Sequence, residues 1–231
     1  MKFVFLKSIM LTFLIAVSIF ASMNLKATQD EEEDLVFNKT WRVVKELGAK
    51  ISYKADQDSW KNDQVLDFNE YEKKDIRYIY GKASLSKKDV MFIAFRGTDN
   101  TRNWIRDGNI LLTSEFEEEK VHPGFKGAYD LIDSKLEEDA VKYLKTNKSL
   151  KRVVFTGHSL GGALATLAVL KMSRILTEKF PKRNLTYYLI TFGSPRVGSP
   201  GFATKVNNIE NLIANVRFIY GNDVVTKVPN W

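Results

Sequence analysis

The feature that most limits the fold is the segment Gly157-His158-Ser159-Leu160-Gly161-Gly162, which directly follows the apolar run Val153-Val154-Phe155. A nucleophilic serine on a sharp turn from a strand into a helix needs small residues two positions before and after it, because the strained backbone packs closely there. Glycines occupy both positions, and a helical pattern continues to about Thr177. We therefore predict a strand, a tight turn that presents Ser159 as a nucleophile, and a helix. An ordinary glycine turn is the alternative.

Strand and helix patterns alternate along the second half of the chain. The short β-rich segments 187–192 and 216–220 predict buried parallel strands, and 76–83 and 90–95 predict a hairpin joined by a polar turn around 86–88. A chain of 231 residues, 44% of them hydrophobic, is long enough for one such domain and too short for two of ordinary size. We predict an α/β fold with a mostly parallel central sheet and helices on both faces.

Two segments have apolar residues every three or four positions, which predicts amphipathic helices. The first covers residues 37–47, and the second is a continuous helix that covers one face of the sheet. The apolar positions of the second are Phe125, Tyr129, Ile132, Leu136, Ala140 and Leu144.

The first residues are typical of a secretory signal peptide. Lys2 and Lys7 precede an apolar run from Ile9 to Phe20, and small residues follow. A signal-anchor helix is the weaker alternative, since the run is shorter than the roughly 20 residues that a membrane span needs. We predict cleavage between positions 21 and 27, a mature domain over 28–231, and an extracellular or secretory-lumen location.

Composition excludes several functions. Removal of residues 1–27 takes away three lysines and no acid, so the net charge falls from +7 to +4. No Lys/Arg block with interleaved aromatic residues occurs, so nothing indicates nucleic-acid binding, whereas weak contact with an anionic membrane surface is allowed. The sequence contains no cysteine. No thiol chemistry, metal cluster or cofactor is therefore predicted.

A serine nucleophile needs an imidazole to take its proton and a carboxylate to orient that imidazole. Asp223 is the best candidate acid, because it follows the predicted strand 216–220 and parallel strands place their sites beyond their carboxyl ends. A plain Asn-Asp turn is the alternative.

Six segments, in this order, resemble the class 3 (fungal-type) triacylglycerol lipases of the α/β-hydrolase superfamily, and they span about residues 90–231. They are Ile93-Ala94-Phe95-Arg96-Gly97-Thr98, Arg102-Asn103-Trp104-Ile105-Arg106-Asp107, Val121-His122-Pro123-Gly124-Phe125, the segment around Ser159, Thr191-Phe192-Gly193-Ser194-Pro195-Arg196-Val197-Gly198, and Asn222-Asp223-Val224-Val225 with Val228-Pro229.

The resemblance implies that Ser159 is the nucleophile, that Asp223 is the triad acid, and that Thr98 and the backbone N–H of Leu160 form the oxyanion hole. The amide of Leu160 also follows from the residues, because the position after the serine begins the helix. For Thr98, a turn residue at a strand end is the alternative.

The resemblance further implies that Asp107 holds the Thr98 hydroxyl and that residues 99 to about 110 form a lid. Trp104 and Ile105 are apolar in this polar stretch, which suits a lid that turns an apolar face to a lipid surface. Ordinary packing of the tryptophan is an equally good explanation.

The sequence contains no evident catalytic base for Ser159. His158, beside the nucleophile, is expected to point away from it into the surroundings of the sheet, and His122 lies in a segment that resembles a structural feature of the family. Lipases of this family carry the catalytic histidine after the triad acid, but residues 224–231 contain none. Either the sequence is incomplete at its C-terminus, which we favour, or it is a variant that has lost its base.

These observations together predict a secreted serine ester hydrolase, most simply a triacylglycerol lipase that acts at a lipid–water interface through an acyl-enzyme on Ser159. A phospholipase A1 or a feruloyl-type esterase has the same motifs. A non-catalytic, lipid-binding relative is the alternative of a different class. The oligomeric state does not follow from the sequence.

Overall fold

The structure is a computed structural model. It describes residues 65–85, 88–97, 112, 114–219, 221 and 223–227. The predicted signal peptide, the predicted helix over 37–47 and the lid segment lie outside the described residues.

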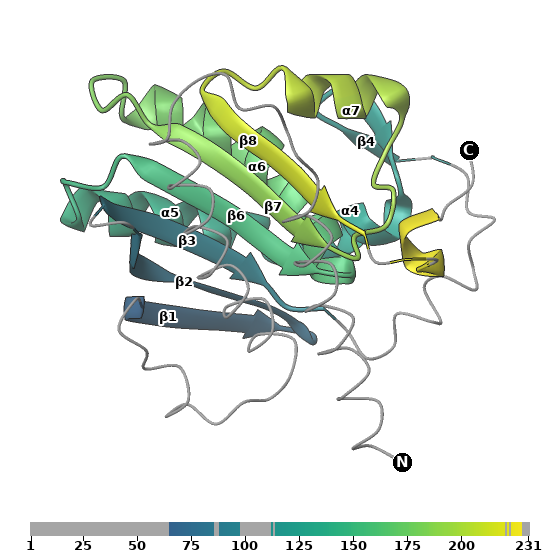
Figure 1. The fold of residues 1–231 in the computed structure, drawn as a ribbon, viewed down its shortest axis with the longest axis horizontal. Helices are drawn as coiled ribbons and strands as arrows, with labels where there is room; N and C mark the ends of the chain where they lie inside the picture. Colours follow the sequence, from purple (N-terminus) through teal and green to yellow (C-terminus); the bar gives the residue numbers. More distant parts are fainter. Residues whose placement is uncertain are drawn as a thin grey trace, which may run out of the picture.

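A six-stranded sheet forms the centre of the domain, in the order β1-β2-β3-β6-β7-β8. The first three strands pair antiparallel, and β3, β6, β7 and β8 run parallel, so the carboxyl ends of these four meet at one edge (Figure 1). The predicted hairpin and the parallel part of the sheet are thus confirmed. The strands are β1 (Val65–Lys73), β2 (Ile76–Leu85), β3 (Lys88–Phe95), β6 (Arg152–His158), β7 (Thr186–Phe192) and β8 (Leu212–Phe218).

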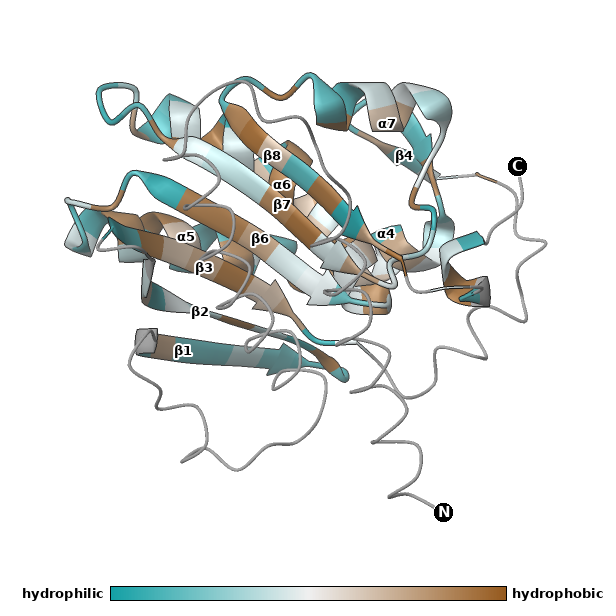
Figure 2. Ribbon diagram, in the orientation of Figure 1, coloured by the Kyte–Doolittle hydropathy of each residue, from teal (hydrophilic) through white to brown (hydrophobic). Residues whose placement is uncertain are grey.

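The helices α4 (Pro123–Asp130), α5 (Asp133–Thr146), α6 (Leu160–Lys179) and α7 (Pro200–Asn207) lie behind the sheet in the view of Figure 1. The predicted helix after Ser159 is confirmed as α6. This helix is long and apolar enough to cross a membrane, but 72% of its apolar window is buried inside the protein. Its apolar residues, brown in Figure 2, pack against strands and neighbouring helices, so α6 is the core helix of the domain.

The single helix predicted over residues 125–144 is instead two helices, α4 and α5. The chain bends at Leu131 and Ile132, where the Ile132 N–H donates to the Tyr129 carbonyl at 3.0 Å. The predicted apolar positions are nevertheless all buried. Periodicity did not reveal the bend, because both helices bury the same side into one core.

Strand β8 also differs from the prediction. It spans Leu212–Phe218, it is an edge strand, and alternate residues along it are exposed. Ile213 is 54% exposed and Ile219, just beyond the strand, is 47% exposed. A run of β-branched residues indicates a strand, but it does not tell whether both faces of that strand are covered.

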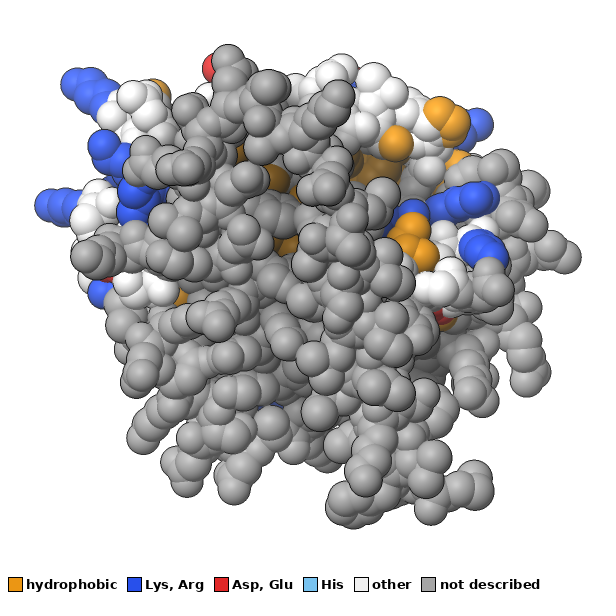
Figure 3. Space-filling view, in the orientation of Figure 1, with side chains coloured by type: hydrophobic (Ala, Val, Ile, Leu, Met, Phe, Trp, Pro, Cys, Tyr) orange, Lys and Arg blue, Asp and Glu red, His pale blue; other side chains and the backbone are white. Residues whose placement is uncertain are grey.

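The second face of the sheet has its own buried cluster, which consists of strand residues such as Phe92, Val154 and Ile190. Hydrophobic side chains of this face are visible in the middle of Figure 3. All four described helices lie on the opposite face. We predicted helices on both faces of the sheet. Within the described residues, they cover one face.

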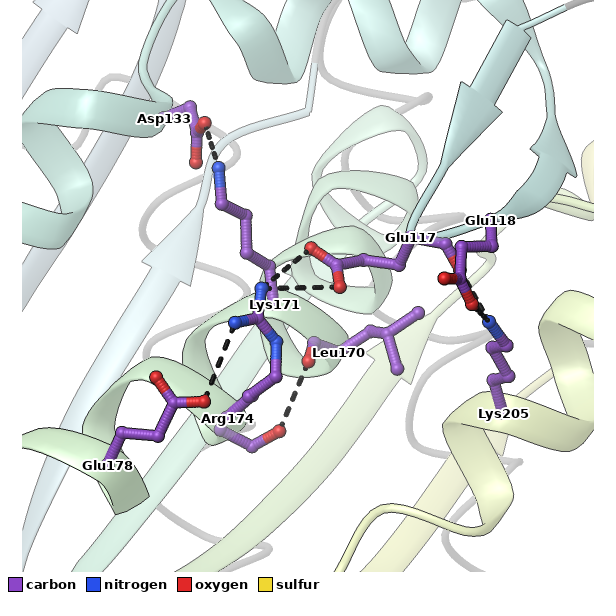
Figure 4. Close-up of polar contacts among 9 residues, drawn as sticks. Glu117, Glu118, Asp133, Leu170, Lys171, Arg174, Glu178 and Lys205 are labelled. Atoms are coloured by element: carbon purple, nitrogen blue, oxygen red, sulfur yellow. Dashed lines mark hydrogen bonds and ion pairs between the residues drawn. The ribbon is translucent and has the colours of Figure 1, made fainter.

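The short hairpin of β4 (Ser114–Phe116) and β5 (Glu119–Val121) is tied to two helices (Figure 4). Its turn residues Glu117 and Glu118 both have positive φ angles, 49° and 66°. Arg174 of α6 contacts the Glu117 carboxylate at 3.2 Å, and Lys205 of α7 contacts the Glu118 carboxylate at 2.9 Å. Exposed ion pairs of this kind contribute less than about 1 kcal/mol each. They orient the hairpin more than they stabilise it.

Replacing Tyr78 by phenylalanine is expected to lower the free energy of unfolding by about 1.5–3 kcal/mol, because the lost hydrogen bond goes to a buried charged group. Tyr78 is fully buried on β2, and its hydroxyl donates to Asp139 of α5 at 2.8 Å. Burial and this carboxylate both raise the pKa of Tyr78, so the hydroxyl stays protonated at any working pH. Denaturant unfolding would measure the change.

A second buried hydroxyl provides a control, because its removal is expected to raise the free energy of unfolding. Thr156 of β6 is fully buried, and its Oγ1 has no hydrogen-bond partner within the described part of the chain. Thr156→Val removes that unsatisfied group without changing the shape, so a gain of about 1 kcal/mol is expected. If both variants lost similar stability, packing and not hydrogen bonding would account for the effect of Tyr78.

Candidate active site

Ser159 stands between β6 and α6 in a conformation that residues with a side chain rarely adopt. Its φ is 55° and its ψ is −122°. The Ser159 N–H donates to the Phe192 carbonyl at the end of β7, at 2.9 Å, and the residue is 5% exposed. Such a conformation costs about 1–3 kcal/mol and persists only where the surroundings impose it. The strained strand-to-helix turn predicted from the sequence is therefore present.

The glycines on either side of Ser159 are required by close approach of backbone segments. A Cβ on Gly157 would lie 2.3 Å from the carbonyl carbon and oxygen of Gly161. A Cβ on Gly161 would lie 2.2 Å from the carbonyl oxygen of Phe95 on β3. The turn therefore packs against itself and against the neighbouring strand, which is the physical reason for the Gly-x-Ser-x-Gly pattern.

We expect Gly161→Ala to destabilise the domain by about 3 kcal/mol or to prevent folding, because the obstructing atoms are backbone and no side chain can move aside. Thermal and denaturant unfolding would measure the loss. Gly127 of α4 is the matched control, since a Cβ there meets nothing within 4 Å. Gly127→Ala is expected to add about 0.5–1 kcal/mol through helix propensity. Equal stability of the two variants would contradict this account of the turn.

The amino terminus of α6 lies directly behind Ser159. The N–H groups of Gly162 and Ala163 donate to the Ser159 carbonyl, at 2.9 and 3.3 Å. The Leu160 N–H precedes them, in the first turn, where helix geometry leaves amides without an intrahelical acceptor. The positive end of the helix dipole is at the same point. An amide in this position is suited to stabilise an oxyanion next to the serine.

Asp223 lies at the same edge of the sheet as Ser159, at the start of the short 3₁₀ helix η2 (Val224–Lys227). Its Oδ1 accepts a hydrogen bond from the Val225 N–H at 3.0 Å. Ser159 follows β6 and Asp223 follows β8, with the end of β7 between them. Because neighbouring strands lie about 4.8 Å apart, the ends of these two strands are about 10 Å apart. An imidazole side chain placed in this gap could contact both groups.

Arg217 fastens the turn that carries Asp223. Its guanidinium donates to the Ser194 carbonyl at 2.6 Å and to the Thr226 carbonyl at 2.7 Å, which joins η2 to the segment after β7. Burial lowers the pKa of Arg217, the nearby Arg196 lowers it further, and Asp223 opposes the shift. The role of Arg217 could not be predicted, because an isolated arginine in a strand has no distinctive signal in the sequence.

The two histidines are not equivalent. His122 is buried, and its Nδ1 accepts from the Gly124 N–H at 3.1 Å and so caps α4. Its ring packs on Phe125 with centroids 4.4 Å apart. Burial lowers its pKa. These contacts agree with the structural role expected for this residue.

The His158 ring lies at the end of the sheet, near Gly97 and Gly193, which agrees with the expectation that it points into the surroundings of the sheet. Its electrostatic interaction with Asp223 was not predicted from the sequence. Asp223 raises the pKa of His158 against a larger lowering by burial. His158 Nε2 and Asp223 Oδ2 both lie beside Gly193, which has a φ of +50°. Gly193 stands in a segment that carries the family resemblance, but nothing in the sequence indicates which groups it separates.

The remaining predicted site residues, Thr98, Asp107, Trp104 and Ile105, lie outside the described residues. The structure thus brings together Ser159, Leu160 and Asp223. Within the described ranges, no three His, Asp or Glu side chains come together as ligands for a metal ion.

Comparisons with known proteins agree with this arrangement. The family model for lipase (class 3) matches residues 92–231. A lipase of Rhizomucor miehei is 36% identical over 142 residues, which are 61% of this chain and 38% of the relative. Secreted mono- and diacylglycerol lipase 1 of Fusarium solani is 34% identical over 146 residues, 62% of this chain and 40% of the relative.

Among solved structures, a triacylglycerol lipase whose catalytic centre is described as a serine protease triad superimposes with a TM-score of 0.57 at 25% identity, covering 83% of this chain and 72% of the other. The chain spans about two fifths of the length of the two curated relatives. The family model covers well over half of the chain, and its match includes both Ser159 and Asp223. The chain therefore belongs to the class 3 lipase family.

Proposed function

We propose that the protein hydrolyses carboxylic esters through an acyl-enzyme on Ser159. The observation that carries this proposal is the position of Ser159. It is held in a strained turn at the amino terminus of α6, at the same sheet edge as Asp223. Strain at a polar residue on such a turn is a common property of catalytic sites.

In the proposed reaction, the Ser159 hydroxyl oxygen attacks the ester carbonyl carbon as an imidazole takes its proton. The negative charge that develops on the carbonyl oxygen is stabilised by the Leu160 N–H, with Thr98 as the second donor and Asp107 supporting Thr98. The alcohol leaves with the proton, and water then releases the acyl group from the serine. Asp223 orients the imidazole and stabilises its charged form. We assign the proton-transfer role to neither His122 nor His158.

For the substrate we propose an acylglycerol at a lipid–water interface, acted on outside the cell or in the secretory lumen. The Rhizomucor miehei relative is named a lipase, and the Fusarium solani relative a secreted mono- and diacylglycerol lipase. Ser159 is only 5% exposed, so an ester must gain access by movement of neighbouring residues. We propose that residues 99–110 form the lid that moves, with Trp104 and Ile105 on its lipid-facing side.

A labelled fluorophosphonate tests the nucleophile directly. Applied to the natural secreted protein, it is expected to modify Ser159, as read by peptide mass spectrometry. Ser159→Ala is the blank, and denatured protein shows the labelling that does not depend on the fold. Absence of labelling in folded natural protein would overturn the proposed function. Turnover of tributyrin, a long-chain triacylglycerol, a phospholipid and a feruloyl ester would then separate a lipase from a phospholipase and a feruloyl-type esterase.

A further inference from the structure

The end of β7 has an unusual feature at Gly193. Its φ of +50° is unfavourable for other residues, and its N–H donates to the Phe218 carbonyl of β8 at 2.9 Å. Where a side chain would begin, two polar atoms lie instead. The position of a Cβ is 3.1 Å from Asp223 Oδ2 and 3.3 Å from His158 Nε2. These two atoms are therefore no further apart than the sum of the two distances, about 6.4 Å.

The His158 ring is bounded by glycine on its other side as well. A Cβ on Gly97, just after β3, would lie 3.6 Å from His158 Nδ1 and 2.8 Å from the His158 carbonyl oxygen. The imidazole therefore lies over the end of β6, between the ends of β3 and β7. Glycine at both boundaries leaves room for the ring and aims Nε2 at Asp223.

The two oxygens of Asp223 have different surroundings. Oδ1 accepts the Val225 N–H at 3.0 Å, within the turn of η2. Oδ2 is the oxygen that lies at Gly193, on the side of His158. The turn itself is anchored by Arg217 through the Thr226 carbonyl. The peptide backbone therefore holds one oxygen, and the His158 imidazole lies on the side of the other.

The charge state of His158 suits this arrangement. Burial lowers the pKa of His158 more than Asp223 raises it, so the ring is neutral at pH 7. A neutral imidazole has one N–H donor and one acceptor nitrogen. The acceptor would repel a carboxylate oxygen, so the tautomer with hydrogen on Nε2 is the stable one beside Asp223.

We propose that His158 is a positioning residue for Asp223, which orients the carboxylate through Nε2 across the gap that Gly193 leaves open. The inference rests on the proposed role of Asp223 as the acid of the site. It gives a function to the residue before the nucleophile, which takes no part in the proton transfers described above.

The electrostatic coupling of the two groups can be tested without activity, because His158 and His122 are the two histidines of the 231-residue sequence and each ring can be followed separately. The pKa of each ring is measured by NMR titration in the natural protein and in Asp223→Asn, and the variants His122→Gln and His158→Gln assign the signals of these two rings. Loss of the carboxylate charge is expected to lower the pKa of His158 by about one unit, because a nearby negative charge favours the protonated ring. The pKa of His122 is expected to stay unchanged. An unchanged pKa for His158 in folded Asp223→Asn would overturn the proposal.

Kinetics test the positioning role itself. His158→Phe keeps a ring of similar size without the N–H, and His158→Gln keeps a donor near the Nε2 position. We expect kcat of the phenylalanine variant to fall by about 10- to 100-fold at unchanged KM, since small displacements of a catalytic group have effects of this size. The acidic limb of its pH–rate profile is expected to move to lower pH, because the catalytic imidazole loses part of its partner. The glutamine variant is expected to recover most of the activity.

The outcomes separate this inference from the proposed function. An inactive natural protein would overturn the proposed function, while the NMR titration would still decide the contact. Natural kcat and an unchanged pH profile in His158→Phe would overturn the positioning role while leaving the hydrolase intact. If His158→Phe does not fold, Gly193→Ala provides the second variant, because its methyl group would enter the gap between the two groups. The Gly193→Ala substitution is expected to lower the pKa of His158, and an unchanged pKa would count against the proposal.

Discussion

Replacing Ser159 by alanine is expected to lower kcat for ester hydrolysis by roughly 10⁴- to 10⁶-fold, which is the size of effect seen when a serine hydrolase loses its nucleophile. The substitution removes one oxygen from a residue whose backbone is held by the Phe192 carbonyl and by the start of α6. Because these contacts remain, stability is expected to change little. Initial rates on a soluble ester, with the natural protein as reference, would measure the loss.

Ser173→Ala is the matched control for this experiment. Ser173 is also buried on α6, and its hydroxyl donates only to the Leu170 carbonyl, at 3.3 Å, within the described contacts. Its removal is expected to leave the rate unchanged. Activity of Ser159→Ala above about one per cent of the natural rate would show that another group is the nucleophile.

Asp223→Asn is expected to reduce kcat by about 10⁴-fold, because an amide can neither stabilise a protonated imidazole nor favour the tautomer that accepts the serine proton. Asparagine keeps an oxygen that can accept from the Val225 N–H, so the η2 turn is expected to persist. The loss of kcat would then measure the effect of the Asp223 charge, and not the effect of its hydrogen bond within the η2 turn. It would be measured on the same soluble ester across pH 5 to 9.

The control here is Asp130→Asn. Asp130 forms an exposed pair with Lys126, at 2.6 Å, on the surface of α4. Removing an exposed pair is expected to change stability by less than about 1 kcal/mol and the rate not at all. A rate for Asp223→Asn close to that of the natural protein would show that Asp223 serves the turn alone.

Much of the fold could be predicted because its causes are local in sequence. The hairpin of β2 and β3, the strand before Ser159 and helix α6 follow from runs of apolar residues and from turn residues. The bend between α4 and α5 could not be predicted, since an apolar stripe continues across it. The exposure of alternate residues of β8 depends on what packs on the faces of the strand, and its own residues do not encode that.

The features of the candidate site likewise fall into those that could be predicted from the sequence and those that could not. Gly157 and Gly161 were identifiable because a side chain at either position would collide with backbone atoms of the turn or of the neighbouring strand. Asp223 was identifiable by its place after a strand. The closeness of His158 to Asp223 joins residues 65 positions apart, and it depends on the order β6-β7-β8 in the sheet.

The sequence by itself determined the strained turn around Ser159, because the Gly-x-Ser-x-Gly pattern marks it and the steric conflict at Gly157 arises within the turn, whereas the conflict at Gly161 is with Phe95 of the neighbouring strand. It also determined that a carboxylate follows the strand before η2. Only the tertiary structure decided what that carboxylate faces. Three strands end side by side, and Gly193 has no side chain to fill the space between them, so His158 Nε2 and Asp223 Oδ2 both lie beside it.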